Sequence, residues 1–124
     1  MTSLLNRIIS LSTLLFIAVI SLNQSALAHD KTTDVTWQLI QNGALVVDVR
    51  TPEEFNQGHL DNAINIPYES IADAFTKQNI AKDRNVVVYC RSGRRSGIAQ
   101  ESLIKLGYQH VHNGGGYQQL MAEK

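Results

Sequence analysis

The stretch VVVYCRSGRRSGIAQESLIKLG (residues 86–107) contains the signals of a strand, a tight loop and a helix in succession. Its first four residues are apolar and mostly β-branched, which is typical of a strand that is buried on both faces. Apolar residues then recur at helical spacing at Ala99, Leu103 and Leu106, and Gly107 provides a helix end. The stretch therefore predicts a strand, a loop that starts at position 90, and a helix over Arg94–Leu106.

The same alternation extends through most of the chain. Three further runs have strand length and three further segments have helical signals: strands at Ala44–Val49, Ala63–Ile66 and, more weakly, Gln109–His112, and helices at Thr36–Gln41, Thr51–Glu54 and Glu69–Gln78. Strands that alternate with helices predict an α/β fold with a mainly parallel sheet and helices on both faces. In such sheets, ligands bind where the carboxyl ends of the strands lead into loops. The loop at position 90 is therefore the first candidate site.

The first 28 residues have the composition of a secretory signal peptide. One cation, Arg7, precedes an apolar stretch from Ile8 to Leu22, and the small-residue triplet Ala26-Leu27-Ala28 follows. The apolar stretch is shorter than the roughly 20 residues that a membrane-spanning helix needs. We therefore expect cleavage after Ala28, export to the periplasm and no stable membrane association after cleavage. Residues 29–124 then form one domain.

The charge of the chain excludes some classes of partner. The chain has 11 basic and 11 acidic residues, and loss of residues 1–28 removes only Arg7, which leaves 10 basic and 11 acidic residues. A nearly neutral chain gives no signal for binding nucleic acid or anionic membranes. The metal-ligand patterns HExxH and CxxC are also absent from the sequence. We therefore expect no nucleic-acid partner and no metal or other cofactor.

Cys90 is the only cysteine in the chain. An exported protein meets an oxidising compartment in which paired cysteines form disulfides, but a lone cysteine has no partner in its own chain. It is then a small buried side chain, a link to another molecule, or a thiol kept for its reactivity. Arg91, Arg94 and Arg95 follow Cys90 closely, together with Gly93 and two serines. This setting favours the reactive thiol.

The loop after Cys90 is expected to form a cradle for an anion. Backbone N–H groups of a strand–loop–helix turn point inward, and the following helix adds the positive end of its dipole. Gly93 permits the tight backbone, and Gly97 is expected to let the helix approach the sheet closely. The amides and the nearby arginines should together lower the pKa of the Cys90 thiol, which raises the fraction of reactive thiolate.

Several thiolate chemistries use a loop of this kind. A Cys-His protease dyad needs a base, and none of His59, His110 and His112 has a spacing that links it to Cys90. Cysteine phosphatases and related arsenate reductases use C-x5-R, whereas this loop reads C-x4-R with Arg95 at its end. The shorter loop suits attack on a terminal sulfur and leaves less room for a phosphate. Sulfur transfer from an anionic donor is thus favoured.

Taken together, the motifs of the chain resemble those of a single-domain rhodanese. They are DVRTPEEF (residues 48–55), GHL (58–60), NAINIP (62–67), CRSGRRS (90–96), GY (107–108) and GGG (114–116). The resemblance spans roughly residues 36–119, and it is strongest to the small periplasmic rhodaneses of the phage-shock type. Asn62 departs from the family pattern, which usually has glycine there.

The resemblance implies a five-stranded parallel sheet and a thiosulfate:cyanide-type sulfurtransferase that works through a persulfide on Cys90. Thiosulfate is then the donor, and cyanide or a thiol is the acceptor. Arg91 and Arg94 are expected to hold the oxygens of the donor. Asp48 and Arg50 are expected to support the site through an ion pair. The substrate-binding loop implied by the resemblance consists of Arg91, Ser92, Gly93, Arg94 and Arg95, the last of which orients the loop through a carboxylate.

Two alternatives to a stand-alone sulfurtransferase stay open. One is a persulfide carrier that delivers sulfur to a partner protein, and the other is a phosphatase-like or arsenate-reducing enzyme. Structural roles are expected for Trp37, which should cover the core, and for His59, which should pack the turn at Gly58. Residues 114–116 are expected to bring the backbone close to the cradle.

Overall fold

The computed structural model describes residues 31–124, and the expected leader, with its cleavage site after Ala28, lies outside this part. Within residues 31–124, no helix combines the length and the apolar character needed to cross a membrane. The elements in chain order are α2 (Lys31–Gln41), β1 (Leu45–Asp48), α3 (Pro52–Asn56), β2 (Ile64–Asn65), a 3-10 turn η1 (Tyr68–Ser70), α4 (Ile71–Lys77), β3 (Asn85–Cys90), α5 (Arg94–Lys105), β4 (His110–Gly116) and α6 (Tyr117–Ala122).

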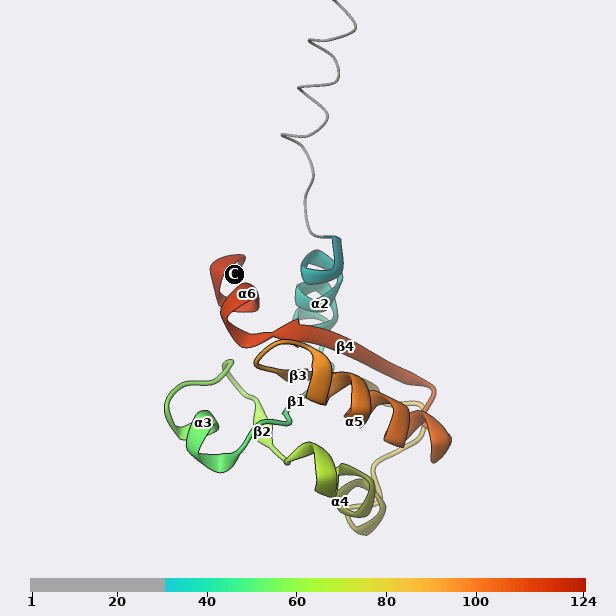
Figure 1. Ribbon diagram of the computed structural model, residues 1–124. Helices are drawn as coiled ribbons and strands as arrows, with labels where there is room; N and C mark the ends of the chain where they lie inside the picture. The colour runs from blue at the N-terminus through green and yellow to red at the C-terminus, as the bar shows by residue number, and fades with distance from the viewer. Residues whose placement is uncertain (1–30) are drawn as a thin grey trace, which may run out of the picture. The chain divides into compact units, whose positions relative to one another are not determined.

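The strands of the described residues form one sheet with the order β2-β1-β3-β4, and all neighbouring strands are parallel (Figure 1). This confirms the α/β fold that the alternation of strands and helices predicted. Four strands are found in residues 31–124, whereas the resemblance implied five. Each of the four apolar runs of strand length forms one of these four strands.

Helices cover both faces of the sheet, as the continuous apolar strands predicted. Trp37 of α2 packs against the buried cluster of Val46, Leu60, Tyr89 and Leu120. It donates its indole N–H to the Leu120 carbonyl of α6 (3.2 Å), so its structural role is confirmed. The first face packs against α4 and α5, and its buried residues include Val47, Val49, Ile71, Phe75, Val86, Val88, Ala99 and Leu103. The second face packs against α2 and α6 through Val46, Leu60, Tyr89 and Leu120.

The ends of the helices follow from local side-chain chemistry. Thr51 and Glu54 form a capping box at the start of α3, with Pro52 in the first turn. Helix α2 begins at Lys31 rather than at Thr36. Thr36 therefore lies inside this helix. Its buried hydroxyl donates a hydrogen bond to the Thr32 carbonyl one turn earlier (2.8 Å), so the polar group is satisfied.

Asn62, the departure from the family pattern, adopts a left-handed backbone conformation with a φ of 63°. Glycine reaches this region without steric cost, and asparagine tolerates it better than most other residues do. The turn before β2 therefore keeps its shape with asparagine at this position. The departure is a conservative one for the backbone.

The carboxyl ends of β1, β3 and β4 meet at one edge of the sheet. Asp48, which ends β1, is in register with Tyr89, and Cys90, which ends β3, is in register with Gly116 at the end of β4. The register of β3 and β4 shifts between Val88 and Cys90. The fold thus places the lone cysteine at the edge where parallel sheets bind ligands.

Candidate active site

Cys90 lies at the bottom of the loop that connects β3 to α5, and its side chain has no exposed surface. The Gly93 N–H donates a hydrogen bond to its sulfur at 3.0 Å, and the Ser96 hydroxyl lies 3.4 Å from the same atom. Gly93 has a φ of 94°, a left-handed conformation that favours glycine and turns the loop back over the sulfur. The predicted cradle is therefore present, with the sulfur as its floor.

The hydrogen bonds of the loop decide the direction of the pKa shift of Cys90. Burial by itself raises the pKa of the thiol, because a buried thiolate loses its hydration. Hydrogen bonds from the Ser96 hydroxyl and from the N–H groups of Ser96, Ser92 and Gly93 act in the opposite direction and outweigh burial, so the pKa lies below its ordinary value. The direction predicted from the sequence is confirmed, but its main causes are amides and a hydroxyl rather than guanidinium groups.

Ser96 and Asn113 belong to the site, although the sequence analysis assigned neither of them to it. The buried Ser96 hydroxyl lies 2.7 Å from Asn113 Oδ1 as well as beside the sulfur. A hydroxyl has one hydrogen, so it donates to one of these acceptors at a time. Asn113 Oδ1 also accepts the Gly115 N–H (3.0 Å), and Asn113 Nδ2 donates to the Gly93 carbonyl (3.0 Å). Asn113 therefore ties β4 to the part of the cysteine loop that leads into α5.

The glycines at the end of β4 come close to the cradle, as predicted. A Cβ atom on Gly116 would lie 2.6 Å from the Arg91 carbonyl oxygen, a separation that backbone atoms cannot accept. A Cβ atom on Gly93 would lie 3.4 Å from the Gly115 Cα. Gly97 differs from its prediction, because a Cβ atom there would make only an ordinary contact, 3.5 Å from Asn113 Nδ2. Close packing of the loop thus depends on Gly116 and not on Gly97.

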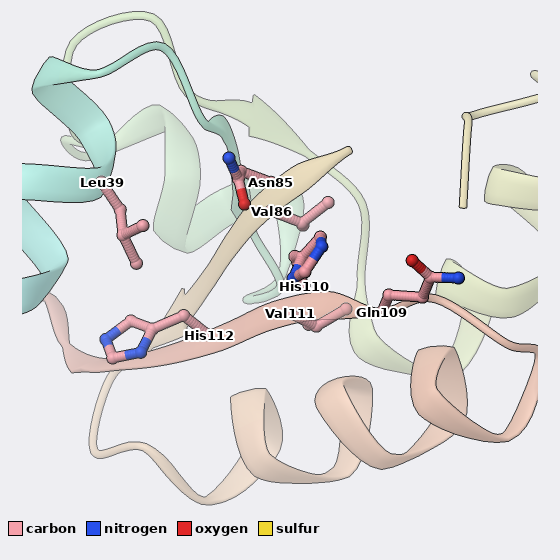
Figure 2. Close-up of a pocket in the computed structure, with 7 residues that line it drawn as sticks. All are labelled: Leu39, Asn85, Val86, Gln109, His110, Val111 and His112. Atoms are coloured by element: carbon pink, nitrogen blue, oxygen red, sulfur yellow. The ribbon is translucent and has the colours of Figure 1, made fainter. Parts of the chain in front are cut away.

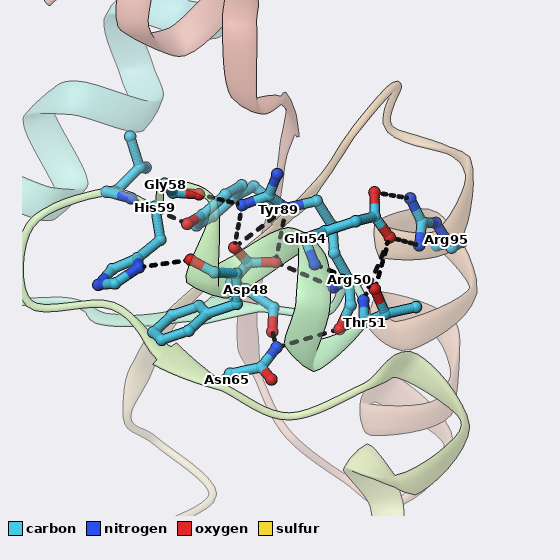
Figure 3. Close-up of polar contacts among 11 residues, drawn as sticks. Asp48, Arg50, Thr51, Glu54, Gly58, His59, Asn65, Tyr89 and Arg95 are labelled. Atoms are coloured by element: carbon cyan, nitrogen blue, oxygen red, sulfur yellow. Dashed lines mark hydrogen bonds and ion pairs between the residues drawn. The ribbon is translucent and has the colours of Figure 1, made fainter.

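The three arginines of the loop have different surroundings. Arg91 and Arg94 are exposed, as is Ser92, and no contact within residues 31–124 engages either guanidinium group. Arg95 instead points to α3, where it binds Glu54 through two hydrogen bonds of 2.7 and 3.0 Å (Figure 3). The carboxylate partner expected for Arg95 is therefore Glu54. This pairing leaves Arg91 and Arg94 available for a ligand.

Glu54 has two tasks at once. Its carboxylate accepts hydrogen bonds from the Thr51 N–H and hydroxyl in the capping box, and it pairs with Arg95 across 41 positions of the chain. The Arg95 guanidinium is the largest cause that lowers the pKa of Glu54, and the Thr51 contacts add to it, so this pKa falls to about 2. The sequence indicated the capping box but not the pair with Arg95.

Asp48 and Arg50 form the predicted ion pair beside the loop (Figure 3). Arg50 Nη2 lies 2.6 Å from Asp48 Oδ2, and both side chains are almost fully buried. The same nitrogen donates to the Gly58 carbonyl at 2.7 Å, and the guanidinium carbon lies 4.6 Å from the centre of the Tyr117 ring. The pair therefore joins the end of β1 to the Gly58 turn and to the start of α6. The contacts of this pair within residues 31–124 join neighbouring loops and do not include Cys90.

A comparison with family models identifies the fold that carries this loop. A model described as "Rhodanese-like domain" matches residues 32–123, nearly all of the described chain. The chain belongs to the rhodanese-like family.

Rhodanese relatives of the chain include enzymes and a solved structure. The thiosulfate sulfurtransferase PspE of Escherichia coli K12 is 41% identical over 78 residues, which cover 63% of this chain and 75% of PspE. A protein named sulfurtransferase from Allochromatium vinosum is 45% identical over 69 residues, or 56% of this chain and 63% of the relative. A structure described as "rhodanese with anions from E. coli" matches with a TM-score of 0.58 and 41% identity, covering 61% of this chain and 89% of that one. The chain therefore groups with rhodanese-type sulfurtransferases.

The three histidines within residues 31–124 of this rhodanese-like chain make their contacts away from the sulfur. His59 Nδ1 hydrogen-bonds to the Phe55 carbonyl (2.8 Å), and its ring stacks on the Phe55 ring, so its packing role is confirmed. His112 shares a hydrogen bond with Thr36 (2.8 Å), and burial lowers its pKa. His59, His112 and the exposed His110 form no hydrogen bond or ion pair with Cys90 within residues 31–124.

A cavity of about 240 Å³ near His112 lies at the wrong end of the sheet for this chemistry. Figure 2 shows its lining, which comes from α2, from the first residues of β3 and from β4. Asn85 and Val86 begin β3, whereas Cys90 ends it, so the cavity and the sulfur are separated by most of the strand. Parallel sheets bind ligands at the opposite edge.

Proposed function

We propose that the chain is a thiosulfate sulfurtransferase that carries sulfur as a persulfide on Cys90. The observation that supports this most is the set of hydrogen bonds that converge on the sulfur from Gly93 and from Ser96. They stabilise a negative charge at this atom before any substrate arrives, as in an oxyanion hole. The proposed donor is thiosulfate because the similar protein PspE is named a thiosulfate sulfurtransferase.

In the first half-reaction, the Cys90 thiolate attacks the outer sulfur of thiosulfate. A bond forms between the two sulfurs, the bond to the sulfonate sulfur breaks, and sulfite leaves with the electron pair. Cys90 then carries a persulfide with one negative charge, and no proton, oxidant or cofactor is consumed. In the second half-reaction, cyanide or a thiolate attacks the outer sulfur, and the Cys90 thiolate leaves.

The loop has a separate role for each of its charged parts. The backbone N–H groups face the sulfur and hold the charge of the thiolate and of the persulfide. The exposed Arg91 and Arg94 are available for the sulfonate oxygens of the donor, which guanidinium groups bind through paired hydrogen bonds. Arg95 is engaged with Glu54 and keeps the start of α5 in place. Because Cys90 has no exposed surface, the side chains over the loop must move aside when the donor enters.

The mass of the intact protein after treatment with thiosulfate tests the proposal. We expect the wild-type chain to gain the mass of one sulfur atom and to lose it again on addition of cyanide. Cys90→Ser should show no gain while it keeps the circular dichroism spectrum of the folded protein. A folded wild-type chain that gains no sulfur would refute the persulfide mechanism.

The same measurement separates the enzyme from the alternatives. A stand-alone enzyme regenerates the free thiol with small acceptors at a rate that matches steady-state turnover. A carrier keeps its persulfide with small thiols and discharges it only to a protein acceptor. A phosphatase-like enzyme hydrolyses phosphate esters without any sulfur donor, and this activity should be absent.

We also propose that the chain is exported to the periplasm and that residues 1–28 are removed. The order of one cation, an apolar stretch and the Ala26-Leu27-Ala28 triplet supports this. Expression of the full chain in a Gram-negative host should yield a protein in the periplasmic fraction that begins at His29. Recovery of the uncut chain in the membrane fraction would contradict the proposal.

A further inference from the structure

A second cavity, with a volume of about 340 Å³, opens beside the cysteine loop. Its lining consists of Arg50, Glu54, Gln57, Arg91, Tyr117 and Gln118. Arg91 directly follows Cys90, and its carbonyl packs on Gly116, the residue before Tyr117. The cavity therefore lies between the cysteine loop, the capping-box helix α3 and the start of α6.

The ion pairs around the cavity leave it with one free positive charge. Arg50 is neutralised by buried Asp48, and Glu54 is neutralised by Arg95 (Figure 3). Arg91 has no such partner within the described residues. The lining thus attracts a small molecule with a negative charge.

The other residues that line the cavity suit a small organic molecule better than a bare ion. The exposed side chains of Gln57 and Gln118 each offer a hydrogen-bond donor and an acceptor. The ring of Tyr117 is half-buried and packs against the Arg50 guanidinium, so it presents a fixed apolar surface. Ligand cavities in proteins typically measure ~300–1,000 Å³, so this volume suits a small organic molecule, and cyanide needs far less space.

We propose that this cavity binds the sulfur acceptor, and that the acceptor is a small thiol that carries a carboxylate. This inference rests on the proposed function, because it concerns the second half-reaction. Sulfite leaves before the acceptor enters, so Arg91 is free to hold the donor's sulfonate first and the acceptor's carboxylate afterwards. The acceptor thiolate attacks the outer sulfur of the Cys90 persulfide, a new sulfur–sulfur bond forms on the acceptor, and the Cys90 thiolate leaves. Charge is conserved in this step.

The test measures how fast three thiols of similar size discharge a preformed persulfide. They are mercaptopropionate, mercaptoethanol and cysteamine, which carry a negative, a neutral and a positive group. The protein is loaded with thiosulfate, desalted and checked for the added sulfur by mass, and discharge rates are expressed per concentration of thiolate. We expect wild-type protein to prefer mercaptopropionate. This preference should fade near 1 M salt, where the Debye length falls to about 3 Å.

Charge changes at Gln118 make the test specific to the cavity. One charge at a distance of about 6 Å in a water-like medium changes a rate about threefold. Gln118→Glu should therefore lower the ratio of mercaptopropionate to mercaptoethanol rates about threefold, and Gln118→Lys should raise it about threefold. Gln78→Glu and Gln78→Lys are matched controls at an exposed position of the α4 end, and they should leave the ratio unchanged.

The outcomes separate this inference from the proposed function. No added sulfur on wild-type Cys90 would overturn the proposed function and this inference with it. A normal mass gain, followed by discharge whose ratio does not respond to the charge at position 118, would overturn the acceptor cavity alone. A ratio that follows the sign of the charge at Gln118, and not at Gln78, supports the cavity.

Discussion

At the scale of single residues, the Ser96 hydroxyl is one of the groups that lower the pKa of the Cys90 thiol. Its one hydrogen lies between two acceptors, the Cys90 sulfur at 3.4 Å and Asn113 Oδ1 at 2.7 Å. When Cys90 is a thiolate, the hydrogen gains a charged acceptor. A hydrogen bond to a charged group contributes about 1.5–3 kcal/mol. Ser96 is therefore a positioning residue whose loss should be seen in the acidity of the thiol.

Replacement of Ser96 by alanine should raise the pKa of Cys90 towards its ordinary value. Below that pKa the thiolate fraction falls as the pH falls, so the acidic limb of the pH–rate profile should move to higher pH. We expect persulfide formation near neutral pH to slow by about tenfold, in line with the loss of one hydrogen bond to a charged group. The rate of alkylation by iodoacetamide as a function of pH measures the shift.

Ser102→Ala is the matched control for this variant. Ser102 lies on the same helix and donates to the Ile98 carbonyl at an exposed position (3.1 Å). Its removal should leave the alkylation profile unchanged. An unaltered profile for Ser96→Ala as well would show that the amides alone set the acidity of Cys90.

Sequence reasoning found the reactive residue but not all of its partners. Cys90, the glycine at position 93 and the separate role of Arg95 could be predicted because strand, loop and helix follow each other in the sequence. Ser96 is only one of two serines that closely follow Cys90 in the sequence, and nothing in the sequence shows that its hydroxyl lies beside the sulfur. Asn113 gave no signal, because it reaches the loop from a strand that is 20 positions away from Gly93. Contacts of this kind depend on how two strands are placed in register.

At the scale of elements, α5 and β4 enclose the cysteine loop from two sides with unequal tolerance. Helix α5 contributes Gly97 in its first turns, where space for a methyl group is available. Strand β4 ends at Gly116, where the Arg91 carbonyl lies too close for any side chain. A methyl group can therefore be added at Gly97 but not at Gly116 without moving the loop.

Gly97→Ala should stabilise the protein, whereas Gly116→Ala should destabilise it. Alanine in a helix interior is favoured over glycine by about 1 kcal/mol, so we expect a small rise in the melting temperature for Gly97→Ala. Gly116→Ala forces the backbone of the loop to move, and overpacking of this kind costs about 1–3 kcal/mol. Its rate of persulfide formation should also drop. Thermal unfolding and the thiosulfate mass assay measure both effects.

The pair of variants contains its own control, since the same methyl group is added at both positions. A loss of stability in Gly97→Ala would show that the added methyl group disturbs Asn113, the nearest group at 3.5 Å. Normal persulfide formation in Gly116→Ala would show that the position of the Arg91 carbonyl is not important for the cradle.

The elements themselves were mostly predictable, because each strand is a compact run of β-branched residues between turn signals. The start of α2 was missed, since Thr32, Thr33 and Thr36 have poor helix propensity and gave no apolar period. Burial of Thr33 and Thr36 overrides that propensity in the fold. The four strands of residues 31–124 coincide with the four apolar runs, whereas the resemblance implied five strands.

At the scale of the whole molecule, the Glu54–Arg95 pair joins the first half of the domain to the second. It connects α3, which follows β1, to α5, which follows β3. The pair is partly exposed, with 22% and 27% of the two side chains accessible, so solvent screens part of its energy. Arg95 nevertheless makes the largest contribution to lowering the pKa of Glu54, which falls to about 2.

Glu54→Gln should lower the free energy of unfolding at neutral pH by about 1 kcal/mol, as expected for a screened pair. A carboxylate whose pKa is lowered on folding stabilises the protein above its unfolded pKa, and this contribution disappears as the pH falls through the folded pKa. The difference between wild type and variant should therefore shrink from pH 4.5 downward and vanish near pH 2. Urea unfolding across this pH range measures it.

Glu53→Gln controls for the loss of a negative charge in the first turn of α3. Glu53 is exposed on the same helix, and it forms no ion pair among the described residues. Glu53→Gln should lower the free energy of unfolding by less than Glu54→Gln does, because it breaks no ion pair with Arg95. Equal curves for the two variants would show that the helix dipole, and not Arg95, accounts for the effect of Glu54.

The complete burial of Cys90 also limits which molecules can form a disulfide with it. A disulfide between two copies needs sulfur atoms about 2.05 Å apart and Cα atoms within roughly 7 Å. The strand end that carries Cys90 lies beneath its own loop and against Gly116, so a second folded chain cannot approach it to that distance. Burial therefore protects the Cys90 thiol from an intermolecular disulfide with a second folded chain, while a small donor or acceptor needs far less room to reach it.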